Sequence, residues 1–168
     1  MSLSMHAMSV PIFVRMLGNL SAILDKAAAH AQAKKIEPAV LLNARLFPDM
    51  FALTRQVQLA TDFAKGAVAR LAGQEPPKYE DTETTIEQLK ARIARTIEYA
   101  RGFEAGAFEG AETREISLKI RDTVQKYTGL VYLCHVVLPN FFFHATTAYD
   151  ILRHNGVELG KRDFVGST

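Results

Sequence analysis

Apolar side chains recur every three or four residues along four long stretches of the chain, and this spacing predicts amphipathic helices. The first helix is expected over residues 9–32, with Ser9 as its N-cap and Pro11 in its first turn. Its apolar face is a single stripe made of Phe13, Leu17, Leu20, Leu24, Ala27 and Ala31.

Two further helices are expected over residues 38–46 and 48–71, and Gly73 with the prolines after it ends the second. Most residues on one face of 48–71 are apolar. Asp49 and Gln56 lie on that same face, and buried polar side chains need hydrogen-bond partners. The pattern therefore predicts a polar contact inside the protein, made from this helix.

A polar linker at 74–81 precedes a helix at about 83–103, which Asp81 or Thr82 can cap. Isoleucine and leucine then alternate with polar residues from 116 to 120, a period of two that favours a small β-hairpin over 116–127.

The last helix is expected over 130–155, with Gly156 as a left-handed residue at its C-terminal end. Pro139 lies in its middle, where a proline removes one backbone hydrogen bond and clashes with the carbonyl of His135. We therefore expect either a kink at 135–139 or two separate helices.

These elements make an all-α protein, a four-helix bundle with a small β-hairpin before the last helix. We expect one domain over residues 1–168, because this length buries a sizeable core without needing a second one. Residues 1–8 are expected to be disordered, and the tail at 157–168 is expected to pack on the bundle.

Composition narrows the function only slightly. The formal charge is +2 and the basic residues are spread along the chain, so a nucleic-acid partner is not expected. No apolar run approaches the roughly 20 residues that span a bilayer, and the N-terminus lacks the pattern of a secretory signal. With a single cysteine, no internal disulfide forms, and we expect a cytoplasmic protein that binds no membrane.

The last helix carries the clearest candidate site. His144 lies beside its core direction, whereas His154, ten residues later, points to solvent. Asn140 precedes His144 by one turn, and no histidine stands at either neighbouring turn, so the i, i+4 histidine pair of a helical metal site is absent. The three phenylalanines at 141–143 do not all fit inward; their expected role is packing, with one or two of them reaching a second subunit.

Motifs of the common enzyme classes are missing. The sequence has no nucleophile elbow, phosphate-binding loop, dinucleotide fingerprint or cysteine cluster. Their absence argues against common hydrolases, kinases and dehydrogenases.

Five segments carry a family resemblance: Arg45-Leu-Phe-Pro-Asp-Met-Phe, Gln56-Val, Arg70-Leu-Ala-Gly73, residues 139–153 and Gly160-Lys-Arg-Asp-Phe. With them, most of the chain resembles the DinB/YfiT-like helical bundle superfamily, and in particular an uncharacterised subfamily of it. The resemblance implies a four-helix bundle. The resemblance also implies the metal site of this superfamily, in which three histidines hold the ion. One lies on the second long helix, and two form a His-x-x-x-His motif on the last.

Carried onto this sequence, the three ligand positions hold Gln56, Asn140 and His144. Only one of them is a histidine, and amide oxygens are poor ligands for zinc or nickel. We therefore expect no cofactor, and a zinc or nickel ion at His144 is the alternative.

The leading hypothesis is a dimeric DinB-like bundle with a degenerate metal site that binds a small molecule between the second and the last long helices. Gln56, Asn140 and His144 would line this pocket, with Asp49 and Arg45 near its rim. One alternative is a metal-dependent hydrolase or transferase that uses His144 as a ligand. Another is a structural or interaction protein without a ligand, so whether the protein is an enzyme is left open.

Overall fold

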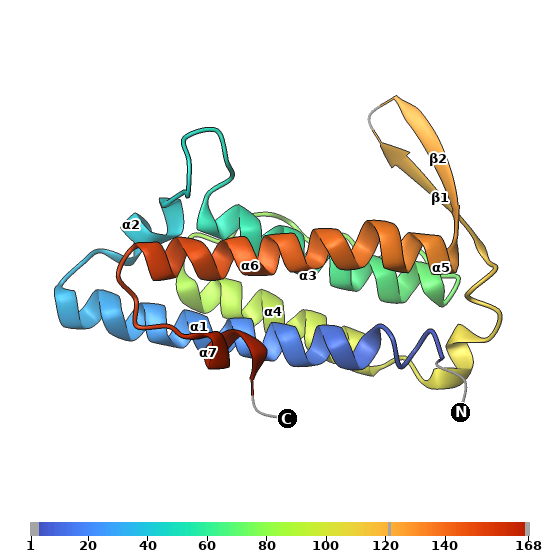
Figure 1. Cartoon of the computed structure of the whole chain (residues 1–168), viewed down its shortest axis with the longest axis horizontal. Coiled ribbons are helices and arrows are strands. Elements are labelled where there is room, and N and C mark those ends of the chain that lie inside the picture. Colours follow the sequence, from blue (N-terminus) through green and yellow to red (C-terminus); the bar gives the residue numbers. More distant parts are fainter. Residues whose placement is uncertain (1–3, 121, 167–168) are drawn as a thin grey trace.

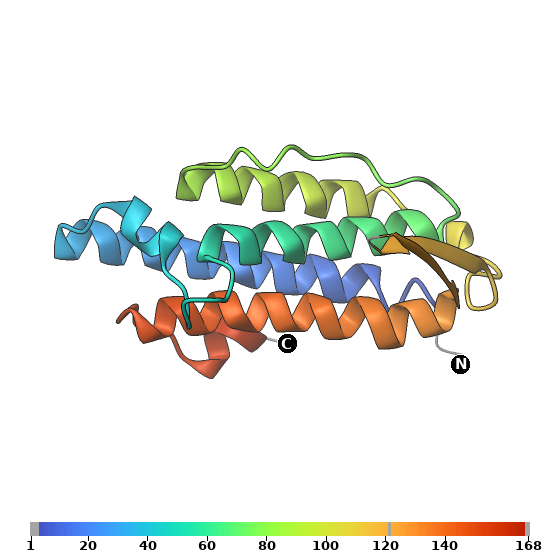
Figure 2. The same ribbon diagram turned by 90° about the horizontal axis from the view of Figure 1, so that it is seen from above.

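Four long helices run side by side in the computed structural model of the chain, which describes residues 4–120 and 122–166 (Figures 1 and 2). The last of them is one continuous helix from Gly129 to His154. It consists of a short start, a π-helical segment and a long α-helical part. The four are α1 (Val10–Lys34), α3 (Leu53–Leu71), α4 (Ile86–Arg101) and the last helix, made of α5 (Gly129–Val131), η2 (Tyr132–Val137) and α6 (Leu138–His154).

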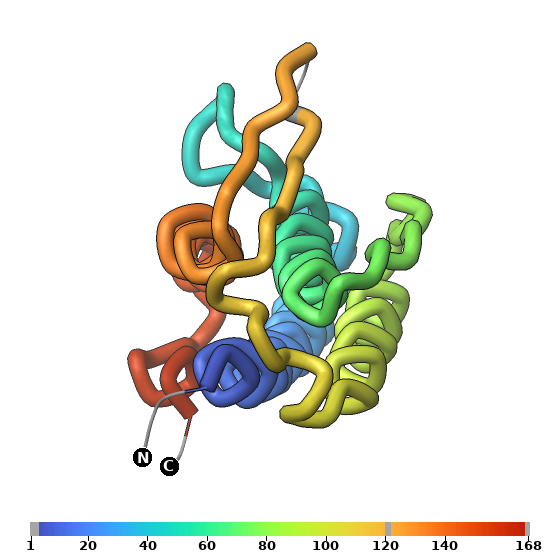
Figure 3. The backbone as a smooth tube through the Cα atoms, turned by 90° about the vertical axis from the view of Figure 1, so that its right-hand side faces the viewer, coloured from blue at the N-terminus to red at the C-terminus, as the bar shows by residue number. Residues whose placement is uncertain are grey.

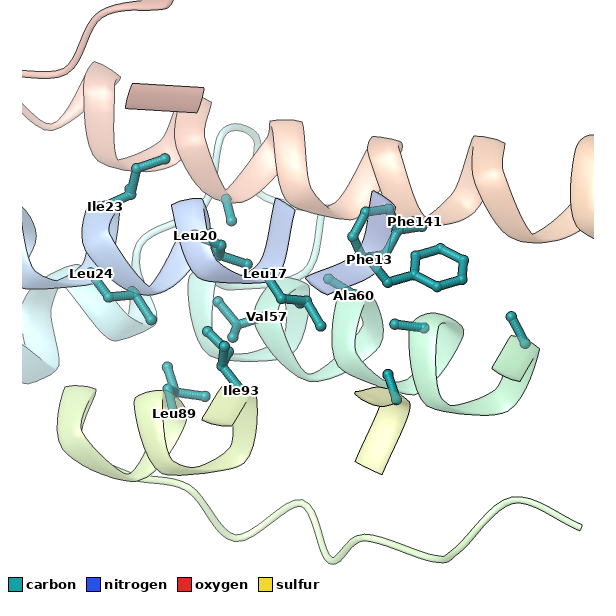
Figure 4. Packing of buried hydrophobic residues seen from close by; sticks show 14 of the residues in the cluster. Phe13, Leu17, Leu20, Ile23, Leu24, Val57, Ala60, Leu89, Ile93 and Phe141 are labelled. Carbon is teal, nitrogen blue, oxygen red and sulfur yellow. The ribbon is translucent and has the colours of Figure 1, made fainter. Parts of the chain in front are cut away.

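The end view shows the helices arranged as a bundle (Figure 3). Helix α3 packs against both α4 and α6, and α1 packs against the same two helices from the other side. Apolar side chains from all four helices meet along the axis (Figure 4). The buried residues labelled there are Phe13, Leu17, Leu20, Ile23 and Leu24 of α1, Val57 and Ala60 of α3, Leu89 and Ile93 of α4, and Phe141 of α6. The expected helical bundle is confirmed.

The small elements lie around this bundle. They are α2 (Pro38–Asn43), the 3-10 helix η1 (Ala105–Phe108), strands β1 (Glu115–Ile120) and β2 (Thr123–Thr128), and α7 (Lys161–Val165). The strands pair antiparallel, with Glu115 opposite Thr128, which confirms the expected hairpin. The hairpin projects from one end of the bundle (Figure 1). It contacts the helices mainly through β1, because β2 is almost wholly exposed.

Helix α3 begins later than the sequence indicates. The backbone N–H of Leu53 donates to the carbonyl of Ala44 at 3.0 Å and closes a loop over residues 44–52. This long-range closure keeps Pro48 and Asp49 outside the helix, so the predicted start at Pro48 is wrong.

Helix α4 also begins later than expected. Its N-cap is Thr85, whose hydroxyl accepts from the N–H of Gln88 in a capping box, and not Asp81 or Thr82. Asp81 is held instead by an ion pair with Arg55 at 2.5 Å. The linker therefore continues to Thr85, beyond its predicted end at residue 81.

The last helix accommodates Pro139 without breaking. The π-helical segment Tyr132–Val137 comes immediately before it, and such a widened turn changes the register of the backbone hydrogen bonds where an α-helix would clash. The chain therefore forms one helix here, and the alternative of two separate helices is wrong. The expected left-handed residue at its end is confirmed, since Gly156 has a φ of 89°.

Both ends of the described part of the chain contact the bundle. Residues 4–8, expected to be disordered, form a turn in which Met5 is buried and His6 contacts the carbonyl of Phe103 at 3.2 Å. The same expectation for residues 1–3 lies outside the described residues. At the other end α7 packs on α1, where Asn19 donates to the carbonyl of Phe164 at 2.9 Å. Residues 167–168 of the predicted tail also lie outside the described part.

The last helix is long and apolar enough to cross a bilayer by length and composition alone, with a mean hydropathy of 1.3 over its most apolar window. The sequence reading had found no run of that kind. Core helices of soluble bundles pass the same test, and this helix buries Phe141, Ala148 and Leu152 against its neighbours.

Candidate functional site

The structure brings together two of the predicted site residues. Gln56 of α3 and His144 of α6 are both buried, and Nδ1 of His144 lies 2.7 Å from Oε1 of Gln56. Nε2 of Gln56 donates to the carbonyl of Phe51 at 3.1 Å, which fixes the orientation of the amide. A polar contact between these two helices is what the buried position of Gln56 in the sequence predicts.

These contacts also fix the tautomer of His144. Because the amide oxygen of Gln56 only accepts hydrogen bonds, Nδ1 of His144 carries the proton and donates it. Burial lowers the pKa of His144, and the nearby positive charge of Arg55 lowers it further, so the ring is neutral at pH 7. Nε2 then presents an unprotonated lone pair.

The lone pair of His144 is accessible. Nε2 has no hydrogen-bond partner within residues 4–120 and 122–166. No side-chain nitrogen or oxygen in that part of the chain is both fully buried and unpartnered, so Nε2 reaches the surface. The ring of Phe63 stacks on the imidazole at 5.7 Å, and Phe143 meets its edge. His144 is therefore a fixed neutral base in an aromatic setting.

Asn140 lies one turn away but does not join this pair. Its Nδ2 donates to the carbonyl of Val136 at 2.7 Å, within the region where the π-helical segment meets Pro139. The side chain thus stabilises its own helix, and its Oδ1 has no partner among the described residues.

Asp49 and Arg45 lie in the loop at 44–52 and are exposed. Arg45 donates to the carbonyl of Met50 at 2.7 Å. Within the described ranges it forms no ion pair with Asp49. Because α3 begins at Leu53, Asp49 is not at a helix N-terminus either.

A cavity of about 440 Å³ lies between α3 and the last helix, under β1. Its floor is apolar, and polar groups reach it from several elements. The lining consists of Leu59, Asp62, Phe63 and Arg70 of α3, Leu118 and Lys119 of β1, Tyr132 and Val136 of η2, and Asn140 of α6. Among the predicted site residues only Asn140 lines it directly.

Two polar pairs bracket this cavity. At one end is Gln56–His144, separated from the cavity by the ring of Phe63. At the other end Arg70 donates to the hydroxyl of Tyr132 at 3.1 Å. Tyr132 and His144 are twelve residues apart, which corresponds to about 18 Å along an ideal helix. The whole groove therefore follows one stripe of the last helix and one stripe of α3.

The opposite face of α3 carries a second polar group that the sequence reading missed. We call it the Arg92 cluster; it consists of Thr61, Asp62, Asp81, Glu83 and Arg92. The guanidinium of Arg92 is buried and donates to Thr61 at 2.8 Å, Asp62 at 2.8 Å and Glu83 at 3.1 Å. It also forms an ion pair with Asp81 at 3.1 Å. The cluster fastens the linker at 74–85 to α3 and α4.

A family model described as a domain of unknown function, DUF1993, matches residues 5–165. The chain belongs to this family. It is also similar to a solved structure described as a DinB family member protein from Shewanella denitrificans, with 47% identity and a TM-score of 0.92 over 97% of this chain and 92% of that one. No curated protein matches the chain. The resemblance to an uncharacterised DinB-like family is confirmed, and neither description states an activity.

The side chains at the three DinB ligand positions fit a zinc or nickel ion poorly. Nδ1 of His144 is a proton donor to Gln56, so only Nε2 can bind a metal, and the two amides bind it weakly. Across the described ranges, no three His, Cys, Asp or Glu side chains are grouped to hold an ion. We therefore derive no chemistry from a metal at this site.

Sequence reasoning missed Arg70 and Tyr132 as lining residues. A signal for Tyr132 was present, because Tyr132, Val136, Asn140 and His144 recur every four residues on the last helix. Of the three adjacent phenylalanines, Phe141 is buried and Phe143 is 56% exposed. That one or two of the three reach a second subunit stays a prediction.

Proposed function

We propose that this protein binds a small organic molecule in the cavity between α3 and the last helix. The observation that carries the proposal is the cavity itself, whose volume of about 440 Å³ lies within the range of ligand sites. Leu59, Phe63 and Val136 supply apolar surface, and a few polar groups converge on it, as ligand sites require. A purely structural bundle would instead be expected to fill this space.

His144 extends the site at one end. Its accessible Nε2 is positioned to accept a hydrogen bond from a ligand that reaches past Phe63, while Gln56 holds the ring in place. Asn140 offers its free Oδ1 to the same ligand. Asp49 and Arg45 lie on the exposed loop at 44–52, and their place at the rim of the site stays a prediction.

The test is a two-dimensional amide NMR screen with neutral, acidic and basic fragments. Binding is expected to shift the amide signals of Phe63, Tyr132 and Asn140, and Leu59→Trp is expected to abolish the shifts by filling the cavity. Val124→Trp adds the same side chain on an exposed strand and should leave binding intact.

Shifts scattered over the surface, or binding that survives Leu59→Trp, would overturn the proposal. Zinc and nickel are measured in the same preparations. A stoichiometric metal that is lost in His144→Ala would favour the metal-dependent alternative instead.

A further inference from the structure

The cavity between α3 and the last helix contains two cations with no carboxylate partner. Arg70 and Lys119 both line it, and neither forms an ion pair with any of the described residues. The one acidic lining residue, Asp62, is already paired with Arg92 at 2.8 Å and with Lys65 at 2.9 Å. The charge left for a ligand is therefore positive.

Arg70 is held in place by the shape of α3. Gly66 lies one turn before it, and a Cβ there would come within 2.5 Å of Nη1 of Arg70. A glycine in a helix interior costs about 1 kcal/mol relative to alanine. This glycine gives the guanidinium room to lie against the helix and to donate to Tyr132 at 3.1 Å.

Tyr132 completes the arrangement as a donor. Its hydroxyl accepts the hydrogen bond of Arg70, which leaves the hydroxyl proton to be donated. Burial raises the pKa of Tyr132 even though the neighbouring guanidinium of Arg70 works in the opposite direction. The phenol therefore stays protonated at neutral pH.

We propose that Arg70, Tyr132 and Lys119 form an anion subsite that binds the carboxylate of a small organic acid, whose apolar body lies along Leu59, Phe63 and Val136. This assignment rests on the proposed function and names its ligand class. The planar fork of Arg70 matches a carboxylate, and the hydroxyl of Tyr132 and the ammonium of Lys119 supply further donors. The apolar lining explains why an acid with a hydrophobic body is favoured over a bare anion.

The test compares phenylacetate with phenylacetamide, which has the same body and no charge, by isothermal titration calorimetry. A charge-assisted hydrogen bond is worth about 10- to 100-fold in affinity, so the acid is expected to bind at least about tenfold more tightly. Arg70→Met is expected to remove most of this preference, because it weakens phenylacetate much more than phenylacetamide. The matched control is Arg95→Met, which removes the same charge from α4, away from the cavity.

Lys119→Met provides a second variant, on an exposed position of β1 where folding is not at risk. It is expected to weaken phenylacetate severalfold and to leave phenylacetamide unchanged. Acetate and inorganic phosphate, which lack an apolar body, are expected to bind far more weakly than phenylacetate.

Equal affinities of the wild type for acid and amide would overturn the anion subsite while leaving the proposed function standing. An acid preference that persists in both Arg70→Met and Lys119→Met would overturn it as well. If acetate or phosphate binds as tightly as phenylacetate, the apolar lining adds no affinity, and the part of the proposal that gives the ligand an apolar body is overturned. If no fragment of any charge binds, both proposals fall.

Discussion

Helix α3 presents a buried polar group on each of two faces. The two groups differ in charge and in whether all of their polar atoms already have a partner. Toward α4 it carries the Arg92 cluster, where one guanidinium, 4% exposed as a residue, meets three carboxylates and a hydroxyl. Toward α6 it carries the pair Gln56–His144, which is neutral and leaves Nε2 of His144 without a partner in the described part of the chain.

The difference separates two uses of buried polarity. The three carboxylates of the Arg92 cluster are balanced by Arg92 together with two further cations, Lys65 on Asp62 and Arg55 on Asp81, so little charge is left to attract a ligand. Along the α6 face, donors and acceptors remain open beside a cavity, at His144, Asn140 and Arg70. The first arrangement suits holding a linker in place, and the second suits binding.

The largest loss of stability is expected for Arg92→Met, on the face of α3 toward α4. Removing the cation takes one ion-pair partner from each of Asp62, Asp81 and Glu83, and breaking a buried ion pair in this way costs about 3–5 kcal/mol. Partial exposure of the carboxylates places the expected loss at the low end, about 3 kcal/mol in the free energy of unfolding. The measurement is urea denaturation at neutral pH.

The control is Arg95→Met, one turn further along α4. Arg95 lies over the ring of Tyr79 at 4.1 Å on the exposed surface, so its loss should cost less than about 1 kcal/mol. If both variants lose the same stability, the Arg92 cluster does not hold the structure and the contrast between the two faces of α3 fails.

Local patterns predicted much of the α6 face. Helical periodicity placed Gln56 and His144 toward the core, and two polar side chains on adjacent buried faces have few partners other than each other. The bundle, the hairpin and the left-handed Gly156 also follow from spacing and turn chemistry. These features depend on residues close together in the sequence.

The Arg92 cluster on the other face of α3 depends on contacts between segments that are distant in the sequence. Helical periodicity carries no information about such contacts. Arg92 falls between Leu89 and Ile93 on a buried stripe, but its partners come from α3 and from the extended linker. The loop at 44–52 shows the same limit. Its closure onto Leu53 sets the helix start later and places Asp49 in the loop and outside the helix.

Gln56→Leu tests the second face of α3, where the polar pair Gln56–His144 is neutral. It leaves the N–H of His144 Nδ1 and the carbonyl of Phe51 without their partner, and a buried unsatisfied group costs about 1–3 kcal/mol. Urea denaturation should show a loss in this range. In the double variant Gln56→Leu/His144→Leu the unpaired donor disappears, so its cost should fall below the sum of the two single costs. Strictly additive costs would mean that the two side chains do not interact.

The smallest expected effect is a difference in pH dependence. Because the pKa of folded His144 is lowered from the ordinary 6.5, the unfolded chain takes up a proton at this residue more readily than the folded chain. The free energy of unfolding therefore decreases as pH falls below about 6.5. The variant His144→Gln has no imidazole to take up this proton, so it should lose less stability than the wild type between pH 8 and pH 5.

Arg95→Met serves as the matched control for this measurement. It changes an exposed residue of α4 and keeps the buried imidazole, so its stability should fall between pH 8 and pH 5 as steeply as that of the wild type. Parallel curves for the wild type and His144→Gln would show that the imidazole is not held neutral by burial. In that case Nε2 would be protonated at mildly acidic pH, and His144 could not accept a hydrogen bond from a ligand there.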